Sequence, residues 1–113
     1  MANTFVNKKV DLTSTSATTL YTVPSATTAV VKSILVSEDS GNADTITVTI
    51  TDTDSAVFNL FNVKAISANG TSELLSAPLV VAESEIIKVT AATANRLHVV
   101  LSALEIKPRI VTS

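Results

Sequence analysis

The segment Asp44–Asp52 most constrains the fold of this chain, because aliphatic and polar residues alternate along it without interruption. Ile46, Val48 and Ile50 fall on one side of an extended backbone, and threonines fall on the other. A period of two predicts a β-strand with one buried face and one solvated face. Several other segments show a similar pattern, so we expect a fold built from strands.

Composition supports this expectation and limits the size of the fold. The chain has 113 residues, of which 46% are hydrophobic and only 16% are charged, and its mean hydropathy is +0.43. Tryptophan is absent and aromatic residues make up 4%, so Val, Ile, Leu and Ala must form the core. β-Branched side chains favour strands, and this length suits one domain. We therefore expect residues 1–113 to form a single domain with short terminal arms at about 1–9 and 107–113.

Turn signals divide the chain into short strands. Strands are predicted at residues 4–13, 18–23, 28–38, 45–51, 56–66, 71–75, 85–91 and 96–106, with a brief apolar run at 79–81. A helix was weighed for 56–66, but Phe, Val and Ile dominate it and no capping box precedes it. The spacing predicts an all-β fold: a single antiparallel β-sandwich of about eight short strands, in jelly-roll or immunoglobulin-like order. The segments 28–38 and 45–51 are expected to form a hairpin across the turn at Ser40–Ala43.

Two predicted strands carry aliphatic residues on both faces. With strict alternation, Val31 and Leu35 lie on one face of 28–38, opposite a set made of Val30, Ile34 and Val36. In 96–106, Leu97, Val99 and Leu101 lie opposite a set made of Val100, Leu104 and Ile106. Such strands either lie centrally between packed layers or face another subunit, and the pattern leaves both interpretations open.

Several function classes are disfavoured by what the chain lacks. The formal net charge is −2 and no basic stripe is present, which disfavours nucleic-acid binding through phosphates. There is no cysteine, so disulfides, thiolate zinc sites and a cysteine nucleophile are excluded. No apolar run reaches the roughly 20 residues of a membrane helix. The first residues do not resemble a signal peptide, so we expect synthesis in a cytosol and no membrane partner.

Candidate catalytic residues are few. His98 is the only histidine and stands among aliphatic residues without a spacing motif for a nucleophile and an orienting partner. Glu73, Glu83 and Glu85 carry the carboxylates that glycoside hydrolysis requires, but nothing places two of them across a cleft. We predict that the chain is not an enzyme and uses no cofactor.

Acidic turns offer a weak calcium signal. Asp52 and Asp54 follow one strand, and Asp39 and Asp44 flank a neighbouring turn. Carboxylate oxygens are calcium ligands, but aspartates are also common in turns because they bond the local backbone. We predict turn residues here and no metal site.

Three groups of segments carry a resemblance to small virion proteins of tailed bacteriophages. They are Leu20–Pro24, Ala29–Val36 and Asp44–Val48, then Leu74–Leu75 with Pro78–Val81, and finally Ala94–Ile106. The resemblance spans about residues 12–106 and rests on packing motifs. It implies a compact β-sandwich that acts as a capsid decoration (cement) protein. On this basis the chain is expected in the virion at the capsid surface, after assembly in the host cytoplasm.

The resemblance also implies partners and an interface. Decoration proteins of this type are often trimers bound to the major capsid protein, so a homotrimer is expected. Residues of the two apolar strands would form the interface: Val30, Ile34, Val36, His98, Val100, Leu104 and Ile106. A tail- or fibre-associated module is the alternative within the family, and a carbohydrate- or surface-binding β-domain is the alternative outside it.

Overall fold

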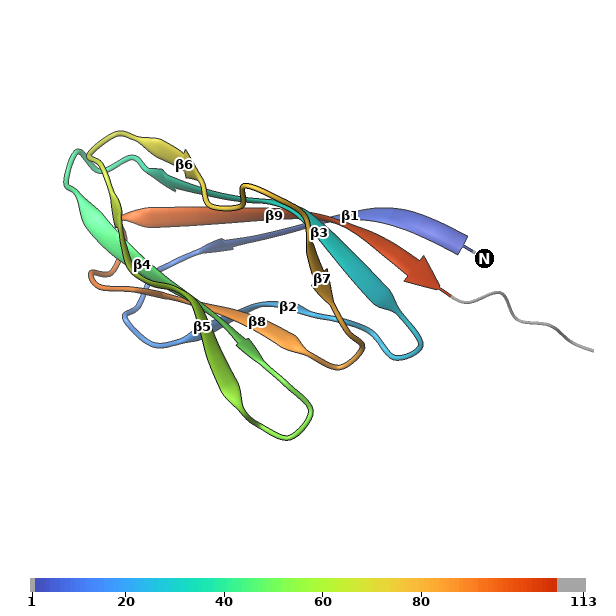
Figure 1. The fold of residues 1–113 in the computed structure, drawn as a ribbon. Helices are drawn as coiled ribbons and strands as arrows, with labels where there is room; N and C mark the ends of the chain where they lie inside the picture. The colour runs from blue at the N-terminus through green and yellow to red at the C-terminus, as the bar shows by residue number, and fades with distance from the viewer. Residues whose placement is uncertain (1, 108–113) are drawn as a thin grey trace, which may run out of the picture.

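The structure is a computed structural model that describes residues 2–107. It confirms the all-β prediction, with nine strands and no helix in that range (Figure 1). The strands are β1 (Ala2–Asp11), β2 (Thr18–Thr22), β3 (Thr28–Glu38), β4 (Asp44–Thr51), β5 (Val57–Ile66), β6 (Thr71–Glu73), β7 (Leu79–Val81), β8 (Ile86–Ala91) and β9 (Leu97–Lys107). Segment 56–66, for which a helix was weighed, is strand β5.

The strands form two antiparallel sheets packed as a jelly roll. One sheet has the order β1-β9-β3-β6, with β7 also paired to β3, and the other has the order β2-β8-β4-β5. If β6 and β7 are taken as one interrupted strand, this is the eight-strand jelly-roll order, in which successive strands alternate between the sheets except for the β4–β5 hairpin. The jelly-roll alternative is therefore the one that the structure shows.

The core lies between the sheets and consists of aliphatic residues from alternate positions. In β4, Ile46, Val48 and Ile50 are buried while the threonines between them are only half-buried. Strand β9 behaves in the same way, with Leu97, Val99 and Leu101 fully buried. Strands β4 and β9 thus each present one face to the opposite sheet, as the period of two predicts.

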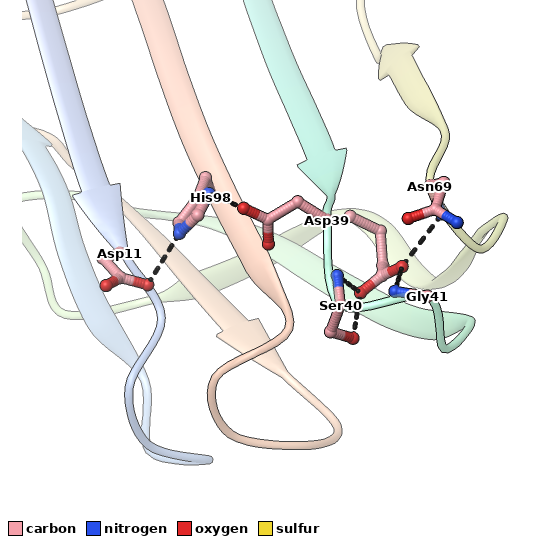
Figure 2. Close-up of polar contacts among 7 residues, drawn as sticks. Asp11, Asp39, Ser40, Gly41, Asn69 and His98 are labelled. Atoms are coloured by element: carbon pink, nitrogen blue, oxygen red, sulfur yellow. Dashed lines mark hydrogen bonds and ion pairs between the residues drawn. The ribbon is translucent and has the colours of Figure 1, made fainter.

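The expected hairpin between 28–38 and 45–51 is wrong, because β3 and β4 belong to different sheets. The chain crosses between the sheets at a corner organised by the buried carboxylate of Glu38, which is 2% exposed. This carboxylate accepts hydrogen bonds from the backbone N–H groups of Ser40 (2.7 Å), Asn69 (2.9 Å), Gly41 (3.1 Å) and Asn42 (3.1 Å), and from the Ser40 hydroxyl. Figure 2 shows Ser40, Gly41 and Asn69 around the end of β3. The corner therefore satisfies backbone groups that a hairpin would pair within one sheet.

The first strand differs from the expected terminal arm. Ala2–Asp11 pairs along its whole length with β9, so residues 2–9 form part of a sheet edge. The strand predicted at 4–13 is present but starts and ends two residues earlier. The C-terminal arm, expected at 107–113, begins at the last residue of β9 and otherwise lies outside the described residues.

One buried hydrogen bond joins the two sheets. The Tyr21 hydroxyl on β2 donates to Glu105 Oε2 on β9 at 2.6 Å, and both residues are buried. Burial, the hydrogen bond and the charge of Glu105 raise the pKa of Tyr21 above its ordinary range, so the phenol keeps its proton and remains a donor. In the described part of the chain no buried side-chain nitrogen or oxygen lacks a partner. This contact therefore completes the polar pairing inside the sandwich.

Replacing Tyr21 by Phe should destabilise the fold by about 2 kcal/mol, because Glu105 would be left buried without its donor. Chemical denaturation monitored by circular dichroism would measure the change. The double variant Tyr21→Phe/Glu105→Leu should recover part of the loss, since no polar group then remains unpaired. A double variant less stable than Tyr21→Phe would contradict the role assigned to this pair.

The Glu38 corner should make stability depend on pH. Burial alone would raise the pKa of Glu38, but the hydrogen bonds outweigh it and lower the pKa from 4.5 to about 2. Because the pKa is lowered on folding, the stabilising effect of the carboxylate is complete above about pH 4.5 and is lost as the pH falls toward 2. We expect Glu38→Gln to be less stable than the wild type at pH 6, with a difference that shrinks steadily down to about pH 2. Urea unfolding across this range would test it, and a difference independent of pH would argue against the corner.

Candidate interaction surfaces

The outward side of the five-stranded sheet carries an apolar row that crosses four strands. Phe5 on β1 opposes Leu104 on β9, Leu104 opposes Val30 on β3, and Val30 opposes Val80 on β7. Phe5 is 79% exposed and Val80 is 64% exposed, while the two residues between them are half-buried. The row is therefore continuous and open to solvent.

A second row on the same side ends in opposite charges. Lys9 on β1 opposes Val100 on β9, Val100 opposes Leu35 on β3, and Leu35 opposes Glu73 on β6. Between the two rows lie the small polar residues Asn7, Ser102 and Ser33. We call this side the outer face, with the apolar residues Phe5, Val30, Leu35, Val80, Val100, Leu104 and Ile106.

Five of the seven residues predicted as an interface lie on the outer side of this sheet, namely Val30, Val100, Leu104, Ile106 and, at one end, His98. Ile34 and Val36 do not, because both are fully buried in the core. The register of β3 against β9 shifts between Val31 and Ser33, so Lys32 is an extra residue at a bulge. A bulge reverses which residues face inward, and strict alternation therefore assigned Ile34 and Val36 to the wrong side.

Glu73 holds the bulge in place. Its carboxylate accepts hydrogen bonds from the Ser33 hydroxyl and from the backbone N–H groups of Ile34 (2.9 Å) and Leu75 (3.1 Å). Burial opposes ionisation, but these hydrogen bonds prevail and lower the pKa of Glu73. The anion at the end of the second row is thus built into the sheet.

Sequence reasoning missed the two most exposed residues of the outer face, Phe5 and Val80. Phe5 stands at the start of the predicted strand 4–13 and within the expected arm 1–9, with no face assigned to it, and Val80 stands in a run too short to assign a face. The signal for the bulge was the pair Lys32-Ser33, two successive polar residues inside an apolar strand.

His98, also a predicted interface residue, lies between two aspartates at one end of the outer face (Figure 2). Its Nε2 is 3.1 Å from Asp11 Oδ1, and its Nδ1 is 3.6 Å from Asp39 Oδ2. The three side chains are substantially exposed. The arrangement ties β1, β9 and the corner after β3 together.

Three apolar side chains are exposed along β5, the edge strand of the four-stranded sheet, and they lie around this edge rather than on one face: Val57 opposes the outward Thr51, whereas Phe58 opposes Ile50 of the core. Val57, Phe58 and Val63 are 61%, 55% and 60% exposed. Val63 has a φ of 52°, a left-handed conformation that is strained for a β-branched residue, and its N–H donates to Thr47 Oγ1 at 3.1 Å. We call Val57, Phe58 and Val63 the β5 surface.

The acidic turn residues bond the backbone. Asp52 Oδ1 accepts from the N–H groups of Asp54 and Ala56, both at 2.9 Å, and Asp44 Oδ2 accepts from Thr93 N–H at 3.1 Å. Within residues 2–107, no three His, Asp or Glu side chains converge so as to hold a metal ion. The same residues include no helix long and apolar enough to cross a membrane.

The comparisons with known proteins give a likeness of fold. No protein-family model matches the chain, and no curated protein matches its sequence. A chain from the acidic stable capsid structure of Helicobacter pylori bacteriophage KHP30 superposes with a TM-score of 0.57 at 15% identity. The match covers 98% of this chain and 92% of the other. The two chains therefore share a fold and have similar lengths.

The bulge in β3 predicts different outcomes for two identical substitutions. Val36→Ala should cost about 2 kcal/mol, because it removes two buried methyl groups and leaves a cavity. Val30→Ala, on the outer face, should cost less than about 1 kcal/mol. Denaturant titrations of both variants would measure the difference, and equal losses would mean that the two valines share one environment.

Proposed function

We propose that this protein is a structural component of a bacteriophage virion that decorates and stabilises the capsid. The observation that carries the proposal is the jelly-roll fold, matched over nearly the whole of both chains to a chain from a phage capsid structure. The resemblance of the sequence to small virion proteins of tailed phages implies the same role. In this proposal the protein binds the lattice of the major capsid protein at the capsid surface.

The surface chemistry supports a role in assembly rather than catalysis. A decoration protein must contact the lattice, and copies that also contact one another hold neighbouring capsomers together. This chain carries two separate apolar surfaces, one on each sheet: the outer face and the β5 surface. Exposed apolar patches of this kind mark protein–protein contacts. No function as an enzyme is part of the proposal.

We assign lattice binding to the β5 surface. The other sheet edges carry features that discourage further pairing, namely Lys8 and Lys9 on β1, Pro24 after the short β2, and Pro78 before the short β7. β5 is longer than β2, β6 and β7, and it presents exposed aliphatic and aromatic side chains. Its strained residue Val63 adds to this assignment, because strained backbone is concentrated at functional sites.

The location of the protein tests the proposed function. Virions produced from the genome that carries the gene should contain the chain in many copies, and antibodies raised against it should label their heads. Mass spectrometry and immunogold electron microscopy would measure both. Labelling confined to the tail would favour the tail- or fibre-associated alternative, and absence from the virions would refute a virion role altogether.

The β5 surface is tested by a matched pair of variants. Val57→Asp should lower binding to capsids that lack the protein by about tenfold or more, because it places an unpaired charge in an apolar contact. Co-sedimentation with such capsids would measure it. Thr15→Asp, which adds the same charge in the exposed turn between β1 and β2 and outside both apolar surfaces, serves as the control for general effects of a new surface charge. Undiminished binding by Val57→Asp would remove the β5 surface from consideration.

A further inference from the structure

We propose that a second copy of this chain covers the outer face, related to the first by a two-fold axis parallel to the strands. This inference does not depend on the virion role, because it rests on the arrangement of charges and apolar residues on the face. A two-fold interface uses the same patch on both copies, so the patch must be complementary to itself. The outer face meets this requirement for one of the two possible axis directions.

The axis direction determines which strands meet. Two sheets that pack face to face lie about 10 Å apart with nearly aligned strands. Rotation about an axis parallel to the strands places β1 over the partner's β6 and β7, and β9 over the partner's β3. The same rotation leaves each row at its own level, so a row meets the same row of the other copy.

The charged row is complementary under this rotation. Lys9 at the β1 end lies over the partner's Glu73 at the β6 end, and the reverse pair forms at the other side. Between them, Val100 lies over the partner's Leu35. Glu73 suits this contact because its hydrogen bonds favour the ionised form. Each cation therefore meets an anion at the edge of the contact, where such pairs fix orientation.

The apolar row is complementary as well. Phe5 lies over the partner's Val80, and Leu104 lies over the partner's Val30. Both exposed side chains become covered, and aromatic residues such as Phe5 are enriched at interfaces. In the row between, Ser102 lies over the partner's Ser33, so small residues meet small residues.

The alternative axis, which runs across the strands, gives a poor match. It places β1 over the partner's β1 and exchanges the charged row with the apolar row. Lys9 would then lie over the partner's Phe5, and Glu73 would lie over the partner's Val80. Each contact would desolvate a charge without a counter-charge, which is costly. The charges thus select the axis parallel to the strands.

The area of the face fits a modest dimer. From His98 to Ile106 the outer face extends about 26 Å along β9, and four strands span about 19 Å, which gives roughly 500 Å² in projection. Accessible area exceeds projected area, so the contact approaches the roughly 800 Å² per partner of a standard interface.

Lys32 opposes association, because the bulge lies in the central row near the axis, where two copies of this exposed lysine approach each other. Lys32→Ala should therefore strengthen the dimer.

Cysteine cross-linking tests the geometry directly, because the chain contains no cysteine. A mixture of Phe5→Cys and Val80→Cys proteins, treated with a bis-maleimide that spans about 10 Å, should give covalent dimers on a denaturing gel. Phe5→Cys alone should not, since its two sulfurs would be separated by about 18 Å. Cross-linking of a Phe5→Cys and Lys9→Cys mixture in place of the first mixture would instead indicate the axis across the strands and overturn the proposal.

The oligomeric state provides the second test. Sedimentation velocity of the full chain should show a dimer. Val80→Asp should raise the dissociation constant of this dimer about 100-fold, because the two-fold symmetry places the substitution at two contacts and each weakens the affinity roughly tenfold. Val57→Asp has nearly the same exposure on the other sheet and should leave the constant unchanged. Circular dichroism would show that both variants fold. A monomer up to about 1 mM, or the trimer that the resemblance implies, would overturn the two-fold proposal.

Discussion

The structure depends on the burial of one aliphatic face of each sheet against the other. With no tryptophan or cysteine, the sandwich is held by small side chains such as Ile46, Val89 and Leu101 that interlock at alternate positions. A two-layer sandwich needs aliphatic residues on only one side of each sheet. Aliphatic residues on the other side, such as Leu104 and Val80, are therefore surplus to the fold, and this is the physical reason to assign them to a contact with another molecule.

How far the sequence predicts this structure depends on whether local alternation or long-range pairing decides the outcome. Alternation identified the strands and the inward face of β4, and it separated the two faces of β9 correctly, because both patterns continue without interruption. It failed in β3, where the extra residue Lys32 reversed the faces of Ile34 and Val36. The bulge is stabilised by Glu73, which lies 40 residues from Ser33 in the sequence, and no local pattern reports such a distant hydrogen bond.

The failed hairpin has a similar cause. A short polar turn between two strands is compatible both with a hairpin and with a crossing between sheets. Glu38 stabilises the crossing, because its buried carboxylate accepts hydrogen bonds from the backbone N–H groups of residues 40–42 and of Asn69 in the turn before β6. From the sequence, Glu38 is an ordinary acidic residue before a turn, and its burial follows only from the packing of the two sheets.

The two apolar surfaces have different consequences for assembly. The outer face is complementary to itself only when rows meet identical rows, and such a contact closes after two copies. The β5 surface lies on the other sheet, so a dimer formed through the outer face leaves both β5 surfaces free. A dimer of this kind presents two equivalent binding surfaces to a lattice. Each can be weak alone, because the second contact of a bound dimer forms at high effective concentration.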